Sequence, residues 1–333
     1  MKTLKNTMQA VSCPRYGNHK NIIVTEKEIP TPGKKEILVR VVATAITTAD
    51  TMMRSGTPKF GRLFLGFVKP KNPFLGTGYS GEIISVGTDV RVFKPGDLIF
   101  GESGLSFGAN AEYVCVDSDG VLFEKPDYLS HEQASCLCDG PLTSYNFIKE
   151  VGRAQKGDKI LINGGAGSLG TAAIQIAKRF GCHVVATSSK ENFEFLRELG
   201  ADSVIDYQSE QFRTMNADFD IVYDAVGKLK FSNSQRLLAN DGKFISPVMS
   251  LNLFCSIFWQ KFTRNKMIAK FSATGLKKPS ELVPHISNLL DLIQNKGLKI
   301  HIEKTFSLAQ VANAHGLIDA GHKRGNFIAK VSN

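Results

Sequence analysis

A glycine-rich segment in the middle of the chain has the residue types and the spacing that suit the binding of a diphosphate. Within this segment, Gly165, Gly167 and Gly170 fit the pattern G-x-G-x-x-G. In this pattern the first glycine allows a tight turn, the second lets the backbone approach a pyrophosphate, and the third lets helix and strand pack closely. The amides and partial positive charge at the start of a following helix suit the same anion. We therefore predict that a dinucleotide contacts Gly165, Ala166, Gly167, Ser168, Leu169 and Gly170.

The elements on either side of these glycines must present them as a turn between a strand and a helix. The apolar run 159–163 predicts the strand, and the amphipathic stretch 171–180 predicts the helix. From about residue 126 onward, strands alternate with helices, which requires crossover connections and predicts a parallel sheet. The expected strands are 159–163, 183–187, 203–206, 220–224 and 243–246, and the expected helices are 132–151, 168–180, 190–199 and 230–239.

The first 125 residues have a different pattern. Short apolar runs are separated by proline and glycine clusters such as Lys94–Asp97, which predicts a mostly antiparallel β domain. The expected strands are 8–13, 22–25, 36–45, 81–86, 97–100 and 111–116. After residue 277 we expect a helix at 280–295 and a final strand, helix and strand between residues 300 and 331.

The end of the second strand after the glycine turn indicates which dinucleotide is bound. A carboxylate at this position would bind a ribose 2′-hydroxyl and reject a 2′-phosphate. Here Ser188, Ser189 and Lys190 occupy it, and the first carboxylate is Glu191. Two hydroxyls and an ammonium suit a phosphate dianion, which predicts NADP(H). In an alternative interpretation, Ser189 caps the next helix and Lys190 is solvated.

Length and composition describe an ordinary globular protein with room for two domains. The 333 residues carry a net charge of +10, but Lys and Arg form no run of five or more, so we expect no nucleic-acid partner. The six cysteines have neither C-x-x-C nor zinc-finger spacing, which indicates reduced thiols. The first ten residues lack the apolar core of a signal peptide. A cytoplasmic location is therefore expected.

The apolar segment 244–262 is the nearest approach to a membrane segment in the chain. Pro247, Asn252 and several serines interrupt it, so it falls short of a spanning helix. We interpret it as a pocket wall or a subunit contact. Its aromatic residues are followed by Lys261, Arg264, Lys266 and Lys270, which leaves contact with a lipid surface as an alternative.

Eight landmarks in a fixed order span nearly the whole chain. They are Val92–Asp97, Gly108–Val114, Lys125–Pro126, Leu142–Ser144, the glycine turn, Leu199–Tyr207, Asp224–Gly227 and Gly321–Asn326. Together they resemble the medium-chain dehydrogenase/reductase superfamily and, within it, the zinc-free quinone oxidoreductase-like branch.

The resemblance implies an α/β fold with two domains. A GroES-like, mostly antiparallel β domain would comprise residues 1–126 and 270–333. A doubly wound Rossmann domain that binds NADP would comprise residues 127–269, inserted before the chain returns to the first domain. The resemblance also implies a homodimer, formed through the last strand of the nucleotide domain.

Zinc-dependent members of this superfamily hold a catalytic zinc at three positions that differ here. The first ligand position is Thr47, the second site reads Gly76-Thr77-Gly78, and the third is Asp139. One carboxylate among threonines and glycines cannot supply the three ligands that catalytic zinc needs, so we expect no metal. Hydride transfer would then rely on positioning and on hydrogen-bond donors. This suits quinones and α,β-unsaturated carbonyls, because conjugation spreads the incoming charge.

The resemblance also carries individual residues. Thr47 would face the substrate, Tyr79 could supply a phenol, and Thr143 would lie near the nicotinamide. Tyr207, Gly227 and Lys323 would contact the cofactor, the first and last near the 2′-phosphate. In the alternative interpretations, Tyr79 is a core or rim aromatic, Thr143 bonds to its own helix, and Tyr207 and Lys323 are solvated.

One departure from the family pattern concerns a substrate-facing tyrosine. Met52 stands at its position and donates no hydrogen bond. Three functions therefore stay open: an NADPH-dependent reductase of a small hydrophobic quinone or enone, an NADPH-binding sensor or structural protein with little turnover, and a metal-free NADP-dependent alcohol or aldehyde oxidoreductase.

Overall fold

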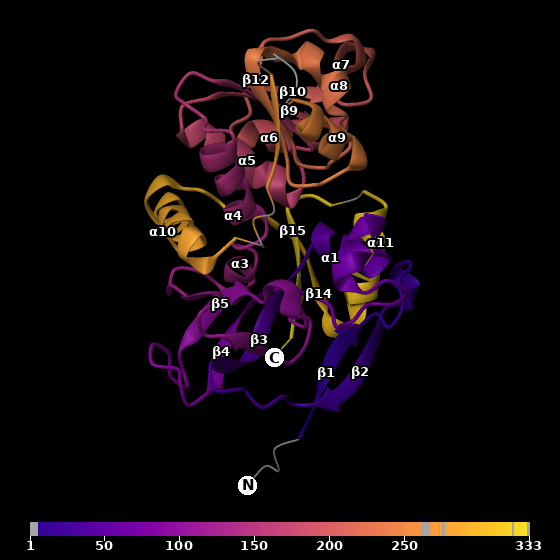
Figure 1. Ribbon diagram of the computed structural model, residues 1–333. Coiled ribbons are helices and arrows are strands. Elements are labelled where there is room, and N and C mark those ends of the chain that lie inside the picture. The colour runs from indigo at the N-terminus through magenta and orange to yellow at the C-terminus, as the bar shows by residue number, and fades with distance from the viewer. Residues whose placement is uncertain (1–5, 261–266, 273, 275–276, 322, 332–333) are drawn as a thin grey trace. The chain divides into compact units, whose positions relative to one another are not determined.

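The computed structural model describes residues 6–260, 267–272, 274, 277–321 and 323–331. The chain forms two compact units (Figure 1). The first comprises residues 1–139, 278–283 and 302–333, and the second comprises residues 140–277 and 284–301. The division expected from the sequence, at residues 126/127 and 269/270, stays a prediction about independently folding domains.

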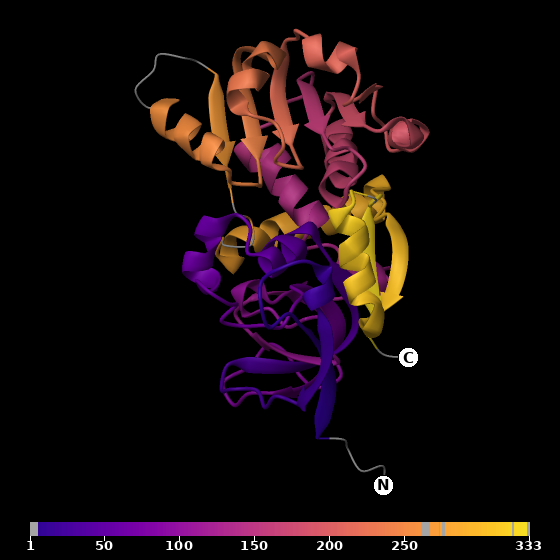
Figure 2. The ribbon, with the colours of Figure 1, turned by 90° about the vertical axis from the view of Figure 1, so that its right-hand side faces the viewer.

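The second unit is built on a six-stranded sheet in which every neighbouring pair is parallel. Its order is β10 (Ser203–Asp206), β9 (His183–Ser188), β8 (Lys159–Asn163), β11 (Phe219–Asp224), β12 (Leu238–Ser246) and β13 (Ile268–Phe271). These strands run side by side in Figure 2. The strand order reverses at β8, and ligands of such sheets bind beyond the carboxyl ends of the strands at this point. The expected doubly wound parallel sheet is therefore confirmed.

Both faces of this sheet are buried, as the apolar strands require. Alternate residues such as Leu161, Val222 and Phe244 belong to one hydrophobic cluster, which also contains Leu253 of α9 (Leu251–Trp259). The intervening residues, such as Ile160, are equally buried. The remaining helices of this unit are α4 (Gly140–Tyr145), a π-helical turn (Asn146–Val151), α5 (Ser168–Arg179), α6 (Phe193–Glu198), α7 (Glu210–Thr214) and α8 (Phe231–Ser234), with most of α10 (Pro279–Lys296).

The first unit contains a seven-stranded, mostly antiparallel sheet. Its order is β14 (Ile302–Ser307), β15 (Asn326–Lys330), β3 (Glu36–Ile46), β4 (Gly78–Val86), β5 (Leu98–Glu102) and β7 (Val121–Glu124), with β6 (Tyr113–Asp117) paired to β3. Strands β1 (Thr7–Ser12) and β2 (Ile23–Glu28) form a separate ladder. Helices α1 (Thr48–Ser55), α2 (Arg62–Leu65), α3 (His131–Ser135) and α11 (Val311–Asp319) accompany them. Because β14 and β15 join this sheet, the expected return of the chain to its first domain is confirmed.

Several expected elements differ from the observed ones. The single helix expected over 132–151 is divided into α3, α4 and the π-helical turn. Pro141 lies in the middle of that range and cannot donate to a preceding helical carbonyl, so it stands at the start of a new helix. The helix expected over 230–239 ends at Leu237, because Leu238 pairs with Phe219 in the sheet.

The membrane-like segment divides between β12 and α9. Its last residues, with Lys261, Arg264 and Lys266, lie outside the described residues. None of the helices in the described part of the chain combines the length and the hydropathy needed to cross a bilayer.

Candidate functional site

The turn after β8 adopts its shape at a different glycine from the one expected. The left-handed φ of +83° belongs to Gly164, which precedes the G-x-G-x-x-G pattern. Gly165 is constrained by packing instead, because a Cβ there would lie 2.9 Å from Leu196 Cδ1 and 3.0 Å from Ala186 Cβ. Gly164 therefore allows the turn, and Gly165 lets the turn pack on the sheet and on α6.

The second and third glycines of the pattern occupy contrasting surroundings. A Cβ on Gly170 would lie 2.2 Å from the carbonyl oxygen of Gly164, so α5 packs against the turn as closely as backbone allows. A Cβ on Gly167 would meet no atom nearer than 3.8 Å. The open side of Gly167 is where a pyrophosphate could approach, which fits the predicted ligand.

Helix α5 begins at this open side. Its first helical backbone bond runs from Thr171 N–H to the Gly167 carbonyl at 2.9 Å. Backbone N–H groups in the first turn of a helix have no carbonyl partner within that helix. Amides at a helix start, together with the helix dipole, favour an anion, which fits the predicted diphosphate.

A buried network of polar side chains from the neighbouring strands holds the glycine turn in place. Asn163 Nδ2 donates to Asp224 Oδ1 at 2.8 Å, and Thr187 Oγ1 donates to Asn163 Oδ1 at 2.7 Å. The Gly164 N–H then donates to Thr187 Oγ1 at 3.2 Å. The sequence analysis missed this network, although Asn163 and Asp224 end β8 and β11, and Thr187 is the residue before the end of β9.

Asp224 also organises the loop that follows β11. Its carboxylate accepts backbone bonds from Val226 at 3.3 Å, Gly227 at 3.0 Å and Leu229 at 2.8 Å. Burial raises the pKa of Asp224, while these donors and Asn163 lower it. Gly227, predicted to contact the cofactor, has a φ of +75°, and a Cβ there would lie 2.4 Å from Val248 Cβ.

The end of β9 brings most of the predicted phosphate-binding residues together. Ser188 is 4% exposed, and its hydroxyl has no hydrogen-bond partner within the described chain. Ser189 does not cap the following turn, because its oxygen accepts instead from Asn192 Nδ2 at 3.1 Å. Lys190 is exposed. Tyr207 lies beside Ser188, because its N–H donates to the Ser188 carbonyl at 3.3 Å.

Thr143 lies on α4, which packs against the start of α5. Ser144 Oγ donates to the Leu169 carbonyl at 2.8 Å, and a Cβ on Gly140 would lie 2.8 Å from the Ser168 carbonyl oxygen. Thr143 itself is half-buried. The second unit therefore holds the predicted cofactor residues, other than Lys323, around the carboxyl ends of its strands.

In the first unit, Thr47 begins α1 in a reciprocal cap with Asp50. Thr47 N–H and Oγ1 donate to Asp50 Oδ2 at 2.8 and 2.9 Å, and the Asp50 N–H donates to Thr47 Oγ1 at 3.0 Å. Both side chains are buried. Burial raises the pKa of Asp50 to about 6, against the lowering effect of the bonds from Thr47.

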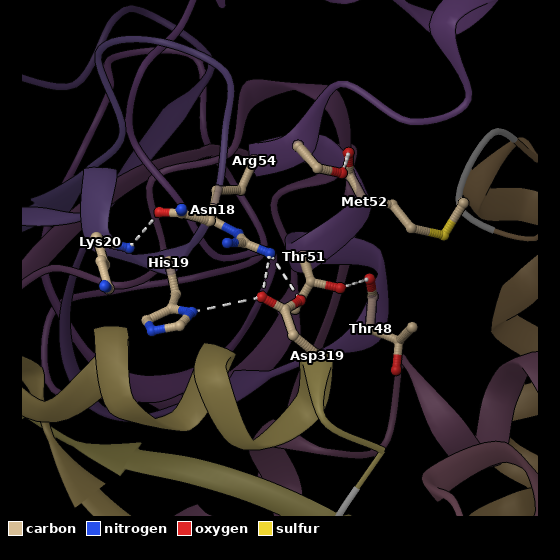
Figure 3. A network of polar contacts seen from close by, with 9 residues as sticks. Asn18, His19, Lys20, Thr48, Thr51, Met52, Arg54 and Asp319 are labelled. Carbon is tan, nitrogen blue, oxygen red and sulfur yellow. Dashed lines mark hydrogen bonds and ion pairs between the residues drawn. The ribbon is translucent and has the colours of Figure 1, made fainter.

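The far end of α1 is held by an ion pair with α11 (Figure 3). Arg54 Nη2 donates to both carboxylate oxygens of Asp319, at 2.7 and 2.8 Å, and His19 Nδ1 lies 3.6 Å from Asp319 Oδ2. Met52 extends away from this pair. Because α1 is anchored at both ends, the position of Thr47 is well fixed.

Two further ionisable groups lie near Asp50. Burial, together with the charges of Asp139 and Asp50, raises the pKa of Glu102 to about 8. Lys323 Nζ donates to the Ile46 carbonyl at 3.0 Å, and burial lowers the pKa of this lysine. This placement favours a structural role for Lys323, and its contact with the 2′-phosphate stays a prediction.

Tyr79 lies in the hydrophobic core of the first unit, which favours the alternative interpretation of a core aromatic. It is fully buried, and its hydroxyl has no partner among the described residues. We therefore expect Tyr79→Phe to leave kcat unchanged and the free energy of unfolding equal or higher, because an unsatisfied hydroxyl is removed. Steady-state kinetics and urea unfolding test this. A loss of kcat of about 100-fold would instead make Tyr79 a proton donor.

The expectation of metal-free chemistry concerns Thr47, Gly76–Gly78 and Asp139, the positions that correspond to zinc ligands. Among the described residues, no group of three or more His, Cys, Asp or Glu side chains could hold a metal ion. The expectation of metal-free chemistry stays a prediction.

Comparison with known proteins agrees with this arrangement. The alcohol dehydrogenase GroES-like domain family matches residues 33–127, and the zinc-binding dehydrogenase family matches residues 199–328. The chain is 29% identical to the chloroplastic quinone-oxidoreductase QR1 of Triphysaria versicolor, over 97% of this chain and 98% of that protein. It is 32% identical to the mitochondrial NAD(P)H oxidoreductase RTN4IP1 of Bos taurus, over 89% and 82%.

A solved structure shares the whole architecture. The quinone oxidoreductase from Coxiella burnetii is 29% identical, with a TM-score of 0.86 over 98% of this chain and 100% of that one. The fold and the glycine turn define a dehydrogenase/reductase with a GroES-like domain and a Rossmann domain. The chain belongs to the medium-chain dehydrogenase/reductase superfamily, in its quinone oxidoreductase-like branch.

Proposed function

We propose that the protein is an NADPH-dependent, zinc-independent reductase that transfers hydride to a quinone or an α,β-unsaturated carbonyl. The observation that carries this proposal is the glycine turn after β8, which is open at Gly167 and fixed by Asn163, Thr187 and Asp224. The printed names of the similar proteins, quinone and NAD(P)H oxidoreductases, support the reaction class. When bound, NADPH supplies the hydride from C4 of its nicotinamide.

The preference for NADPH rests on the end of β9. The buried, unpartnered hydroxyl of Ser188 and the exposed ammonium of Lys190 suit a phosphate dianion, and they lie at the position where a ribose 2′-substituent is bound. These groups support NADPH over NADH, a choice that the glycine turn alone does not make.

Replacing Lys190 should separate the two cofactors. We expect Lys190→Glu to raise the Kd for NADPH about tenfold or more, because a carboxylate would face the phosphate, and to leave the Kd for NADH nearly unchanged. Lys156→Glu is the control, since Lys156 is an equally exposed lysine of the same unit. Fluorescence titration gives both constants. Equal effects on NADPH and NADH would remove Lys190 from the phosphate site.

Thr47 and Asp50 form the second part of the proposal. In place of a metal, the hydroxyl of Thr47 stabilises charge on the acceptor oxygen. When Asp50 is protonated, the bond between Thr47 Oγ1 and Asp50 Oδ2 reverses, so that Asp50 donates and the Thr47 proton is free to turn toward the acceptor. As hydride reaches the acceptor carbon, Asp50 gives its proton to Thr47 Oγ1, and Thr47 gives its own proton to the acceptor oxygen. Water then reprotonates Asp50, so the product gains one hydride and one proton.

This relay predicts a pH dependence. With its pKa raised to about 6, Asp50 loses its proton as the pH rises through that value, so kcat/KM should fall above about pH 6. Asp50→Asn should remove this inflection and lower kcat about 100-fold. Thr47→Ser should retain activity and Thr47→Val should lose it. Variants that lower stability but keep the wild-type pH profile would show that the pair is only a helix cap.

The reaction itself is tested with purified protein, NADPH or NADH, and four acceptors: 1,4-benzoquinone, 9,10-phenanthrenequinone, an alkenal and a simple aldehyde. Loss of absorbance at 340 nm with quinone or alkenal, faster with NADPH, is the expected result. Tight NADPH binding without turnover would support a sensor instead. Turnover of the simple aldehyde alone would support a carbonyl oxidoreductase.

A further inference from the structure

Lys323 brings a positive charge into the first unit beside the start of α1. Its Nζ donates to the carbonyl of Ile46 at 3.0 Å, and Ile46 ends β3 directly before Thr47. Burial lowers the pKa of Lys323, because an ammonium loses hydration when it leaves water. Such a buried charge is costly unless neighbouring groups compensate it.

The fold holds this ammonium at a defined place. Lys323 Nζ lies 5.6 Å from the centre of the Phe327 ring, within the range of a cation–π interaction. Phe327 is the residue of β15 that pairs with Ile46 of β3. The next residue along the chain is also fixed, because the Arg324 N–H donates to a carboxylate oxygen of Glu303 in β14. The lysine is therefore anchored where β15 meets the end of β3.

Carboxyl groups from several elements compensate the charge of Lys323. The charges of Asp139, Asp50 and Glu303 raise its pKa and so oppose the effect of burial. The influence is mutual at Asp50. Burial raises the pKa of Asp50 to about 6, and among the nearby charges Asp139 raises it and Lys323 lowers it. How readily Asp50 keeps a proton therefore depends on the charge of Lys323.

Three further ionisable groups interact with this pair but are mostly uncharged near neutral pH. The charge of Asp50 acts on Glu102 of β5, and the charge of Lys323 acts on Cys136, which follows α3, and on His315 of α11. Burial raises the pKa of Glu102 to about 8 and that of Cys136 to about 12, and it lowers that of His315 to about 3. The positive charge that acts on Asp50 is thus that of Lys323.

We propose that Lys323 is a positioning residue of the reaction centre. Its ammonium fixes the peptide before Thr47, and its charge sets how readily Asp50 keeps the proton that is passed to the acceptor. An acid that holds its proton too tightly transfers it slowly, and one that holds it too weakly is already ionised at the working pH. This catalytic consequence rests on the proposed function, whereas the hydrogen bond and the charges act without turnover.

Substitutions at Lys323 separate the charge from the hydrogen bond. Lys323→Arg keeps both, Lys323→Gln keeps a donor without the charge, and Lys323→Met removes both while leaving an apolar side chain. Lys330→Met is the control, because Lys330 is a lysine at the end of β15 that pairs with Glu132 at 2.6 Å. Circular dichroism checks that each variant folds. Because two variants remove the charge, either of them is sufficient for the test.

The carboxyl ¹³C signal of Asp50 reports the effect of the charge without turnover. The full chain is labelled at its aspartate carboxyl carbons, and Asp50→Asn assigns the signal. We expect a titration midpoint of about 6 in the wild type. In Lys323→Gln and Lys323→Met the midpoint should rise by about one pH unit or more, because a neighbouring positive charge favours the carboxylate. Lys323→Arg and Lys330→Met should leave it in place. A midpoint that stays at its wild-type value without the lysine charge would overturn the proposal.

Steady-state kinetics test the catalytic consequence. The pH at which kcat/KM falls should move up with the Asp50 midpoint in Lys323→Gln. In Lys323→Met, kcat should fall about tenfold, because the peptide before Thr47 also loses its hydrogen bond. The Kd for NADPH should stay within about twofold of the wild-type value.

Three results would separate this role from other roles of Lys323. A higher Kd for NADPH without a change for NADH would assign Lys323 to the 2′-phosphate and overturn the proposal. A loss of stability with the wild-type pH profile would make Lys323 a purely structural residue and would also overturn it. If the Asp50 midpoint moved but the wild-type protein reduced no acceptor, the effect of the Lys323 charge would be supported and the proposed function would fail.

Discussion

Alanine at Gly170 should lower both the stability of the protein and its affinity for NADPH. Its Cβ would lie 2.2 Å from the Gly164 carbonyl oxygen and 2.6 Å from Gly165 Cα, and these neighbours are backbone atoms that cannot rotate away. We expect the free energy of unfolding to fall by about 1–3 kcal/mol. Because the turn would also move away from the helix start, kcat/KM should fall about 100-fold or more.

Gly167→Ala is the matched variant, because it makes the same chemical change three residues earlier. A Cβ there would meet no atom nearer than 3.8 Å, and the φ of −73° suits any residue. Stability should therefore stay within about 0.5 kcal/mol of wild type. NADPH affinity should still fall, because the added methyl group would occupy the space proposed for the pyrophosphate.

The two measurements are urea unfolding and titration of NADPH. Only the pair of variants distinguishes a glycine needed for packing from a glycine needed for the ligand. If Gly167→Ala left NADPH affinity unchanged, the open side of the turn would not be the pyrophosphate site. If Gly170→Ala left stability unchanged, the close contact between α5 and the turn would be less rigid than the distances indicate.

The sequence predicted the parallel sheet and the helix after the glycines because local signals there agree. Residues 160–162 are continuously apolar, the glycines follow after Asn163, and an amphipathic stretch comes next, so one arrangement satisfies all three signals. The strand, helix and strand that end the chain were also predicted from their local pattern, whereas the return of β14 and β15 to the first sheet was implied by the family resemblance. In each case the residues that determine an element are neighbours in the chain.

Other features depend on contacts between distant residues. Leu238 continues a predicted helix in sequence, yet it pairs with Phe219 and starts a strand. Gly164 rather than Gly165 has the left-handed φ, because Val226 and the sheet restrict the turn from outside it. Lys323 is drawn to the Ile46 carbonyl across 277 residues. No local pattern contains these partners.

The buried network around Asp224 also joins residues that are distant in the sequence. Its loss should produce the largest change in the free energy of unfolding. Asp224 accepts from Asn163 Nδ2 and from the N–H groups of Val226, Gly227 and Leu229. Asp224→Ala leaves these four donors without their acceptor, Asn163 Nδ2 in a buried site and the three N–H groups in a partly buried loop. Since each unsatisfied donor costs about 1–3 kcal/mol and partial relaxation recovers some of it, we expect a loss of about 3–5 kcal/mol in the free energy of unfolding.

Two further substitutions locate the effect. Asp224→Asn keeps one oxygen acceptor but turns an amide toward the Leu229 N–H, so about 1–3 kcal/mol should be lost. Asp218→Ala removes an aspartate of the same unit whose side chain is 74% exposed and paired with Lys159, and it should cost no more than about 1 kcal/mol. Urea unfolding followed by circular dichroism gives all three values. If Asp224→Ala cost no more than Asp218→Ala, the network would not support the turn, and Gly164 would have to be held by its packing against Val226 alone.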